Sequence, residues 1–155
     1  MSSNRRDAIT MTVDEVHSFI ESRRSLQVGT LDRDGSVHLS TLWFAVVDSK
    51  IVFETYTKSQ KIKNLERDSR ITVLLEDGLT YETLRGVMIK GRARLVTSAA
   101  EVHPLAMAVM RRNQPEIPEE LLTTVAEQMA QKRTAVVVEP VRVVSWDHTK
   151  LGGSI

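Results

Sequence analysis

The chain has 155 residues, enough for one domain and too few for two ordinary ones. It contains no cysteine, which excludes disulfides, thiolate catalysis and cysteine-ligated zinc, and which fits a cytoplasmic protein. Lysine and arginine number 21 against 20 aspartates and glutamates, a balance that argues against a general nucleic-acid-binding surface. No apolar run approaches the ~20 residues of a membrane span, so we expect a soluble protein without a membrane partner.

The order of helical and extended patterns predicts a small, strand-rich domain. Residues 1–10 are polar and are expected to form a loose tail. A capping box at Thr12–Glu15 opens the first helix, Ser98–Glu101 opens a later one, and Pro118 suits the first turn of the last. Helices are predicted over 13–23, 59–67, 98–112 and 118–132. Strands are predicted over 26–31, 37–47, 51–56, 70–76, 87–96 and 135–146.

Short polar turns separate the first three strands, at 32–35 and 48–50. Strands joined by such turns pair as antiparallel neighbours. No internal repeat or linker interrupts the pattern. We therefore predict a single domain over 1–155, mainly β, with a six-stranded antiparallel barrel surrounded by peripheral helices.

The stretch from Thr55 to Leu65 is the most informative part of the sequence. It leaves a strand, turns and enters a helix near Ser59, where free amide groups and the positive end of the helix dipole favour an anion. Lys58, Lys61 and Lys63 add positive charge there, as a phosphate monoester requires. The same pattern also fits an ordinary capped surface helix with solvated lysines.

A second candidate element is the strand segment from His38 to Trp43. We expect its histidine, serine and threonine to share one face, where Ser40 and Thr41 would hydrogen-bond a planar heterocycle. A solvent-facing strand side with satisfied hydroxyls fits the same residues.

Other site classes find no support in the sequence. The four histidines lack metal-ligand spacing, so no metal site is predicted. The nucleophile elbow of serine hydrolases, the dinucleotide-binding glycine motif and the Walker A loop are also absent.

The ordered motifs together resemble the split β-barrel superfamily of the pyridoxamine 5'-phosphate oxidases. More narrowly, they are similar to its actinobacterial branch that uses the deazaflavin coenzyme F420. The resemblance spans residues 13–153. It is carried by the motifs Leu-Gln-Val-Gly-Thr-Leu at 26–31, Ser-Thr-Leu-Trp-Phe at 40–44, Thr-Lys-Ser-Gln-Lys-Ile-Lys-Asn-Leu at 57–65, Lys-Gly-Arg-Ala at 90–93 and Ser-Trp-Asp-His-Thr-Lys-Leu-Gly-Gly at 145–153.

The resemblance implies a homodimer with two cofactor sites at its interface. The oxidases' Ser-Arg-Lys phosphate motif reads Ser-Gln-Lys here, and their partner-chain glutamine falls near 85–86. Their conserved tryptophan matches Trp146, but the arginine that follows it has no counterpart, which argues against pyridoxamine phosphate oxidation. The implied cofactor-binding residues are His38, Ser40, Thr41, Leu42, Trp43, Glu54, Thr55, Lys58, Ser59, Gln60, Lys61, Arg85, Gly86 and Trp146.

The function implied by this resemblance is hydride transfer between reduced F420 and an unsaturated small molecule, such as a quinone, an enone or a tetrapyrrole. The polyglutamate tail of F420 would favour a basic groove, built from Lys58, Lys61, Lys63 and Arg85. No catalytic side chain is identified. The alternatives are an FMN-dependent oxidase or reductase and a cofactor-binding or storage protein without turnover.

Overall fold

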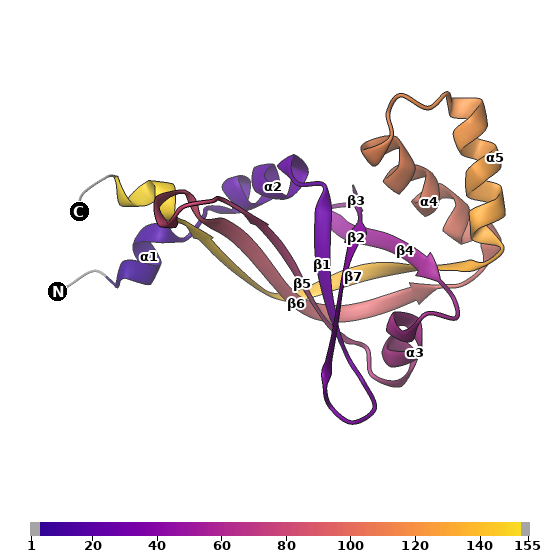
Figure 1. Cartoon of the computed structure of the whole chain (residues 1–155), viewed down its shortest axis with the longest axis horizontal. Helices are drawn as coiled ribbons and strands as arrows, with labels where there is room; N and C mark the ends of the chain where they lie inside the picture. The colour runs from indigo at the N-terminus through magenta and orange to yellow at the C-terminus, as the bar shows by residue number, and fades with distance from the viewer. Residues whose placement is uncertain (1–3, 153–155) are drawn as a thin grey trace.

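A computed structural model describes residues 4–152 and shows one curled antiparallel sheet with helices around it (Figure 1). The sheet has seven strands in the order β2-β1-β5-β6-β7-β4-β3. Their bounds are β1 Ser25–Leu31, β2 Val37–Trp43, β3 Ala45–Val47, β4 Lys50–Tyr56, β5 Arg70–Asp77, β6 Arg85–Val96 and β7 Arg133–Asp147. The predicted antiparallel split-barrel fold is confirmed.

One predicted strand is in fact two. The expected strand over 37–47 breaks at Phe44, which gives seven strands instead of six. The two halves lie at opposite edges of the sheet, β2 against β1 and β3 against β4. Because Phe44 joins both edges directly, the sheet has to curl until they meet, and this curl forms the barrel.

Two neighbouring residues of one helix hold the break in place. The side chain of Asn113 donates a hydrogen bond to the Phe44 carbonyl, at 3.1 Å. The Arg112 guanidinium lies over the Phe44 ring at 4.2 Å and donates to the Ile20 and Glu21 carbonyls. The break is therefore braced from outside the sheet.

The helices are α1 Arg5–Ile9, α2 Val13–Ser22, α3 Gln60–Arg67, α4 Ala99–Asn113 and α5 Glu119–Ala130. Helix α1 forms where a loose tail was expected. Asn4 caps this helix, although the helix buries no side chain. Residues 1–3 of that tail lie outside the described residues. The capping box at Thr12 is confirmed, whereas Ser98 makes only the half that accepts from the Glu101 amide. Pro118 precedes the first helical turn of α5 as its N-cap.

The main hydrophobic core fills the inside of the curl. Alternate side chains of β1, β4, β5 and β7 point into it, including the fully buried Val28, Phe53, Val73 and Val136. Helices α4 and α5 form their own apolar cluster, and α4 covers β3 and β4. Strands β5, β6 and β7 extend beyond the barrel to an end where α1 lies against the short helical turn His148–Leu151 (Figure 1).

Candidate functional site

Strand β2 is an edge strand, so one side of its backbone has no neighbouring strand in the described sheet. Alternation places His38, Ser40 and Leu42 on its more buried face, and leaves Thr41 and Trp43 exposed on the other. The expectation that Thr41 shares a face with His38 and Ser40 is wrong, because side chains of a strand alternate with a period of two. The pairing of His38 with Ser40 on one face is confirmed.

Two buried polar atoms on this strand have no hydrogen-bond partner among residues 4–152. They are Nδ1 of His38 and Oγ of Ser40. Buried polar groups are almost always paired in native proteins, and leaving one unpaired costs about 1–3 kcal/mol. The inner side of β2 thus carries unmet hydrogen-bonding capacity at a sheet edge.

Helix α3 begins as the sequence predicts, at a serine cap. The Ser59 hydroxyl accepts from the Ile62 amide, at 3.4 Å. Lys61 in the first turn is half-buried, and burial lowers the pKa of its ammonium group. No ion pair to Lys61 is found within residues 4–152, whereas Lys58 and Lys63 are exposed. A desolvated cation without a counter-ion is the arrangement expected of an anion site.

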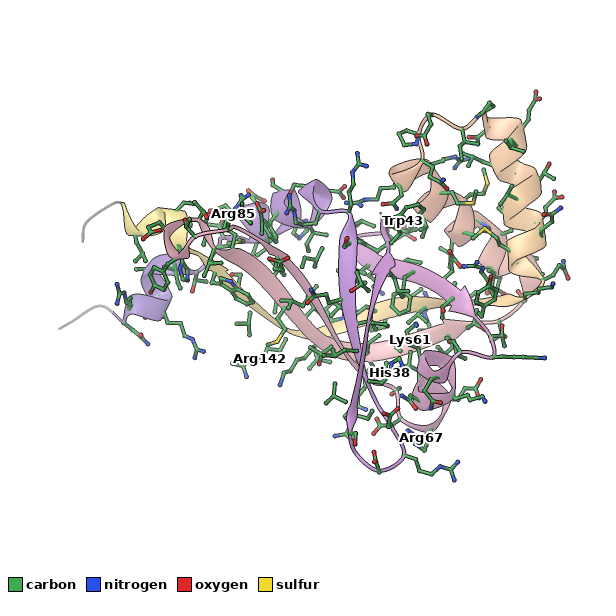
Figure 2. All side chains as sticks on the ribbon, viewed as in Figure 1. His38, Trp43, Lys61, Arg67, Arg85 and Arg142 are labelled. Carbon is green, nitrogen blue, oxygen red and sulfur yellow. The ribbon has the colours of Figure 1, made fainter. Side chains whose placement is uncertain are left out.

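A buried asparagine connects α3 to the strand pair that carries His38. Asn64 donates to the Thr30 hydroxyl at 3.1 Å and to the Asp32 carboxylate at 2.9 Å, and accepts from the Gln60 side chain at 2.8 Å. Thr30 is the cross-strand partner of His38. The start of α3 and the inner face of β2 are thereby held in one neighbourhood, as Figure 2 also shows for Lys61 and His38.

The predicted residues at the end of β4 are engaged within the chain. The Glu54 carboxylate, 8% exposed, makes an ion pair of 2.8 Å with Arg133. Thr55 is buried opposite Thr134 in the β4–β7 ladder. Glu54 would have to break this ion pair to bind a ligand through its side chain, and the Thr55 side chain is buried.

The remaining predicted residues lie at the far end of the long strands. Arg85 makes a 2.5 Å ion pair with Asp77, which also bonds Arg23, and hydrogen bonding from Arg85 lowers the pKa of the Asp77 carboxyl. Gly86 pairs with Trp146, and a methyl group on Gly86 would lie 2.1 Å from the Trp146 ring. The tryptophan ring therefore covers the glycine.

The predicted site residues form two separate groups within one chain. Arg85 and Lys61 are well separated in Figure 2, with Arg85 at the extended end and Lys61 in the first turn of α3. The group around β2 and α3 is brought together, and the group of Arg85, Gly86 and Trp146 does not join it. One chain by itself does not assemble the complete predicted site.

A cavity that the sequence pattern did not indicate lies between α2, the β3–β4 hairpin and β7. Its volume is about 530 Å³, and no predicted cofactor residue lines it. Four of its lining side chains come from the main core, namely Ile20, Ile51, Ile89 and Val138. Its lining comes from four separated segments of the chain, in α2, the β3–β4 hairpin, β6 and β7, so no local motif marks it.

Two properties of residues 4–152 bear on the class of site. None of the helices in this range is both long and apolar enough to cross a membrane. No group of three or more His, Asp or Glu side chains in the same range is placed to hold a metal ion.

Comparison with known proteins gives one family match and several structural relatives. The family model described as pyridoxamine 5'-phosphate oxidase matches residues 12–147. A conserved hypothetical protein from Mycobacterium tuberculosis is 39% identical, covers 99% of this chain and 95% of its own, and superposes with a TM-score of 0.90. No curated protein matches the sequence closely.

Two more distant structures show the same fold. An F420 reductase is 19% identical over 82% of this chain and 94% of its own, with a TM-score of 0.65. A heme storage protein from Vibrio cholerae is 16% identical over 86% of this chain and 94% of its own, with a TM-score of 0.67. At these identities the likeness concerns the fold alone, and one fold hosts different ligands.

Proposed function

Because the chain belongs to the pyridoxamine 5'-phosphate oxidase family, whose members bind flavins or deazaflavins, we propose that it is a reductase that uses the deazaflavin coenzyme F420. The substrate would be an unsaturated small molecule such as a quinone, an enone or a tetrapyrrole. The observation that carries the proposal is the half-buried Lys61, which has no counter-ion in the described part of the chain and lies next to an edge strand whose buried polar atoms are unpaired there too.

The residues present fit such a cofactor. Nδ1 of His38 and Oγ of Ser40 are buried without a partner in the range 4–152, and a heterocycle edge or a ribityl hydroxyl would satisfy them. An edge strand also offers backbone N–H and C=O groups in a row, which matches the alternating donors and acceptors of a pyrimidine ring. The predicted segment from His38 to Trp43 supplies that edge.

The phosphate group would be held at the start of α3. Lys61 would provide a charge-assisted hydrogen bond, and the Ser59 hydroxyl together with the first amides of the helix would provide further donors. Gln60 stands where the oxidases have arginine, and its side chain is engaged by Asn64. Lys58 would supply the missing charge from the exposed side of the turn.

The bound coenzyme supplies hydride transfer to or from the substrate. The chain's own residues bind and orient it and exclude water from its inner face. No side chain at the β2–α3 group is assigned as a proton donor.

To reach the cofactor, the second group of predicted residues would need a second copy of the chain. Arg85, Gly86 and Trp146 would complete the site of the partner in a homodimer with two equivalent sites. The separation of the two groups within one chain, and the exposed apolar side chains Val37, Leu39 and Trp43 on β2, support this arrangement.

Two alternatives remain for the same site. FMN shares the ring system, ribityl chain and phosphate, so it fits the same donors. Storage without turnover is favoured by one observation: the heme storage protein has the same fold, which shows that the fold serves carriers as well as enzymes.

The test is a titration of purified protein with F420 and with FMN, read by cofactor fluorescence. Lys61→Ala should weaken F420 binding by about 10- to 150-fold, because a hydrogen bond to a charged group contributes about 1.5–3 kcal/mol. Lys132→Ala is the matched control and should bind as the unchanged protein does, because Lys132 is exposed and has no ion pair with any described residue. Equal affinity of the Lys61 and Lys132 variants would refute the phosphate assignment. Tighter binding of FMN than of F420 would identify FMN as the cofactor. If neither a quinone nor an enone reoxidised the bound, reduced F420, storage would be favoured.

A further inference from the structure

The pairing of the two longest strands contains one irregularity. Along β6 and β7, Gly91 pairs with Pro140 and Lys90 pairs with Arg142, so Val141 has no partner in the ladder. This is a β-bulge, a feature that commonly re-aims a side chain at a functional position. Val141 is 75% exposed.

The bulge decides which way Arg142 points. In a regular ladder, Lys90 would pair with Val141 and Arg142 would pair with Ile89, a residue of the main core. Directly paired residues project from the same face of a sheet. The extra residue therefore moves Arg142 from the core face to the outer face, directly opposite Lys90.

This arrangement places two like charges side by side. Like charges in directly opposite positions destabilise a sheet. Within residues 4–152, neither Lys90 nor Arg142 takes part in an ion pair. The two carboxylates on the flanking segments are occupied, Glu139 by Lys50 and Arg94, and Asp68 by Arg70.

A hollow adjoins Lys90, and Arg142 lies across the ladder from Lys90 without lining it. The hollow has a volume of about 260 Å³, and its lining includes Lys90, Arg70 and Thr72 beside apolar side chains such as Val37. Thr72 is the cross-strand partner of Lys90 on β5, and Gly29 beside it has no side chain to fill the space. Cations together with a threonine hydroxyl around a small depression form a donor set suited to a phosphate group.

We propose that Lys90 and Arg142, with Thr72 at the hollow, form a binding site for the phosphate group of a small phosphorylated molecule. This site is separate from the proposed cofactor site. Arg142 lies well away from Lys61 in Figure 2, on the stretch of β7 that leads to the extended end. At the bulge, Val141 loses its ladder partner and is exposed. A site that needs Lys90 and Arg142 on the same face explains both features.

The experiment compares inorganic phosphate and ribose 5-phosphate with chloride at equal ionic strength, using calorimetric titration of the full-length protein. Lys90→Gln and Arg142→Gln should each weaken phosphate binding by about tenfold or more. In chloride, each variant should melt about 0.5–3 °C higher than the unchanged protein, because the like-charge contact is gone. If either residue had only a structural role, its variant would melt at a lower temperature than the unchanged protein.

The matched controls are Lys132→Gln and Arg33→Gln, which change two exposed cations that form no ion pair within the structurally described range. Both should keep phosphate binding and melting temperature. Phosphate binding that survives Lys90→Gln and Arg142→Gln but is lost in Lys61→Gln would overturn the proposal and locate the phosphate at α3. Binding of both inorganic phosphate and ribose 5-phosphate to the outer face supports the site. Binding of ribose 5-phosphate alone also supports it and indicates that the sugar is recognised as well. Lys61→Gln also distinguishes the two proposals, because its binding of FMN or F420 is measured separately from its binding of phosphate.

Discussion

The brace at Phe44 offers a sharp test of how the barrel closes. Asn113 is 7% exposed and donates to the carbonyls of Phe44, at 3.1 Å, and Val109, at 2.7 Å. Phe44 lies between β2 and β3 and is fully buried. Asn113→Ala would leave the Phe44 carbonyl buried without its side-chain donor. The Val109 carbonyl is less affected, because it lies four residues before Asn113 in the same helix.

The expected loss of stability comes from one buried carbonyl, that of Phe44, which loses its side-chain donor. A buried acceptor without its partner costs about 1–3 kcal/mol, which corresponds to a melting temperature about 2–12 °C lower in a domain of this size. Asn113→Asp should cost more than Asn113→Ala, because a carboxylate would face two carbonyl oxygens and offer no donor. Thermal unfolding followed by circular dichroism measures both variants.

The order of the two variants is decisive. If Asn113 contributed only volume, Asp would be the milder change since its side chain has nearly the same size. An Asp variant at least as stable as the Ala variant would refute the donor role. Gln131→Ala, an exposed amide at the end of α5, is the control and should leave the melting temperature unchanged.

Three other predictions can be checked with simple measurements. Gly86→Ala should lower the melting temperature by about 2–10 °C, because the new methyl group would lie 2.1 Å from the Trp146 ring; Gly29→Ala, whose nearest neighbour would be 3.4 Å away, should be tolerated. Burial lowers the pKa of Lys61, so cofactor affinity should fall as pH rises through a value below the ordinary lysine pKa of about 10.4, and this fall should be absent in Lys61→Gln. Light scattering should give twice the 17.4 kDa chain mass, and a monomer at micromolar concentration would contradict the two-chain site.

Local signals in the sequence predicted the elements well. Capping residues such as Thr12 and Ser59 mark the start of helices, and polar turns mark the hairpins, so most bounds agree within about two residues. The start of α3, with Lys61 in its first turn, was likewise predictable because it depends on neighbours in the chain. The pattern also placed His38 and Ser40 on one strand face.

Features that depend on distant partners were not predictable. The break at Phe44 requires Asn113, which is 69 residues away, and the bulge at Val141 appears only once β6 and β7 are in register. Residues 42–47 form an unbroken apolar run without a turn residue, so the pattern reads as one strand. The occupied state of Glu54 depends on Arg133, a partner 79 residues later. Pairing across the sheet, rather than local propensity, determines these features.

The separation of the two residue groups also changes the explanation of cofactor choice. We expect F420 to bind more tightly than FMN, and the preference to weaken with salt, because the polyglutamate tail carries charges that FMN lacks. Arg85 is unsuited to a basic groove beside Lys61 of its own chain, because it lies at the extended end and is paired with Asp77. Lys58 and Lys63 are exposed near the start of α3 and have no ion pair in residues 4–152.

The salt dependence of F420 affinity should therefore come from Lys58 and Lys63. Raising the salt from 0.1 M to 1 M shortens the Debye length from about 10 Å to about 3 Å, which screens exposed charges and leaves a half-buried contact to Lys61 largely intact. Each exposed pair contributes on the order of 0–1 kcal/mol, so the double variant Lys58→Gln/Lys63→Gln should lose at most about 30-fold in affinity at low salt and nothing at high salt. Binding curves at both ionic strengths measure this. A double variant with the same salt response as the unchanged protein would show that the tail is not held by these lysines, whereas FMN binding more tightly at both salts would contradict the choice of F420 itself.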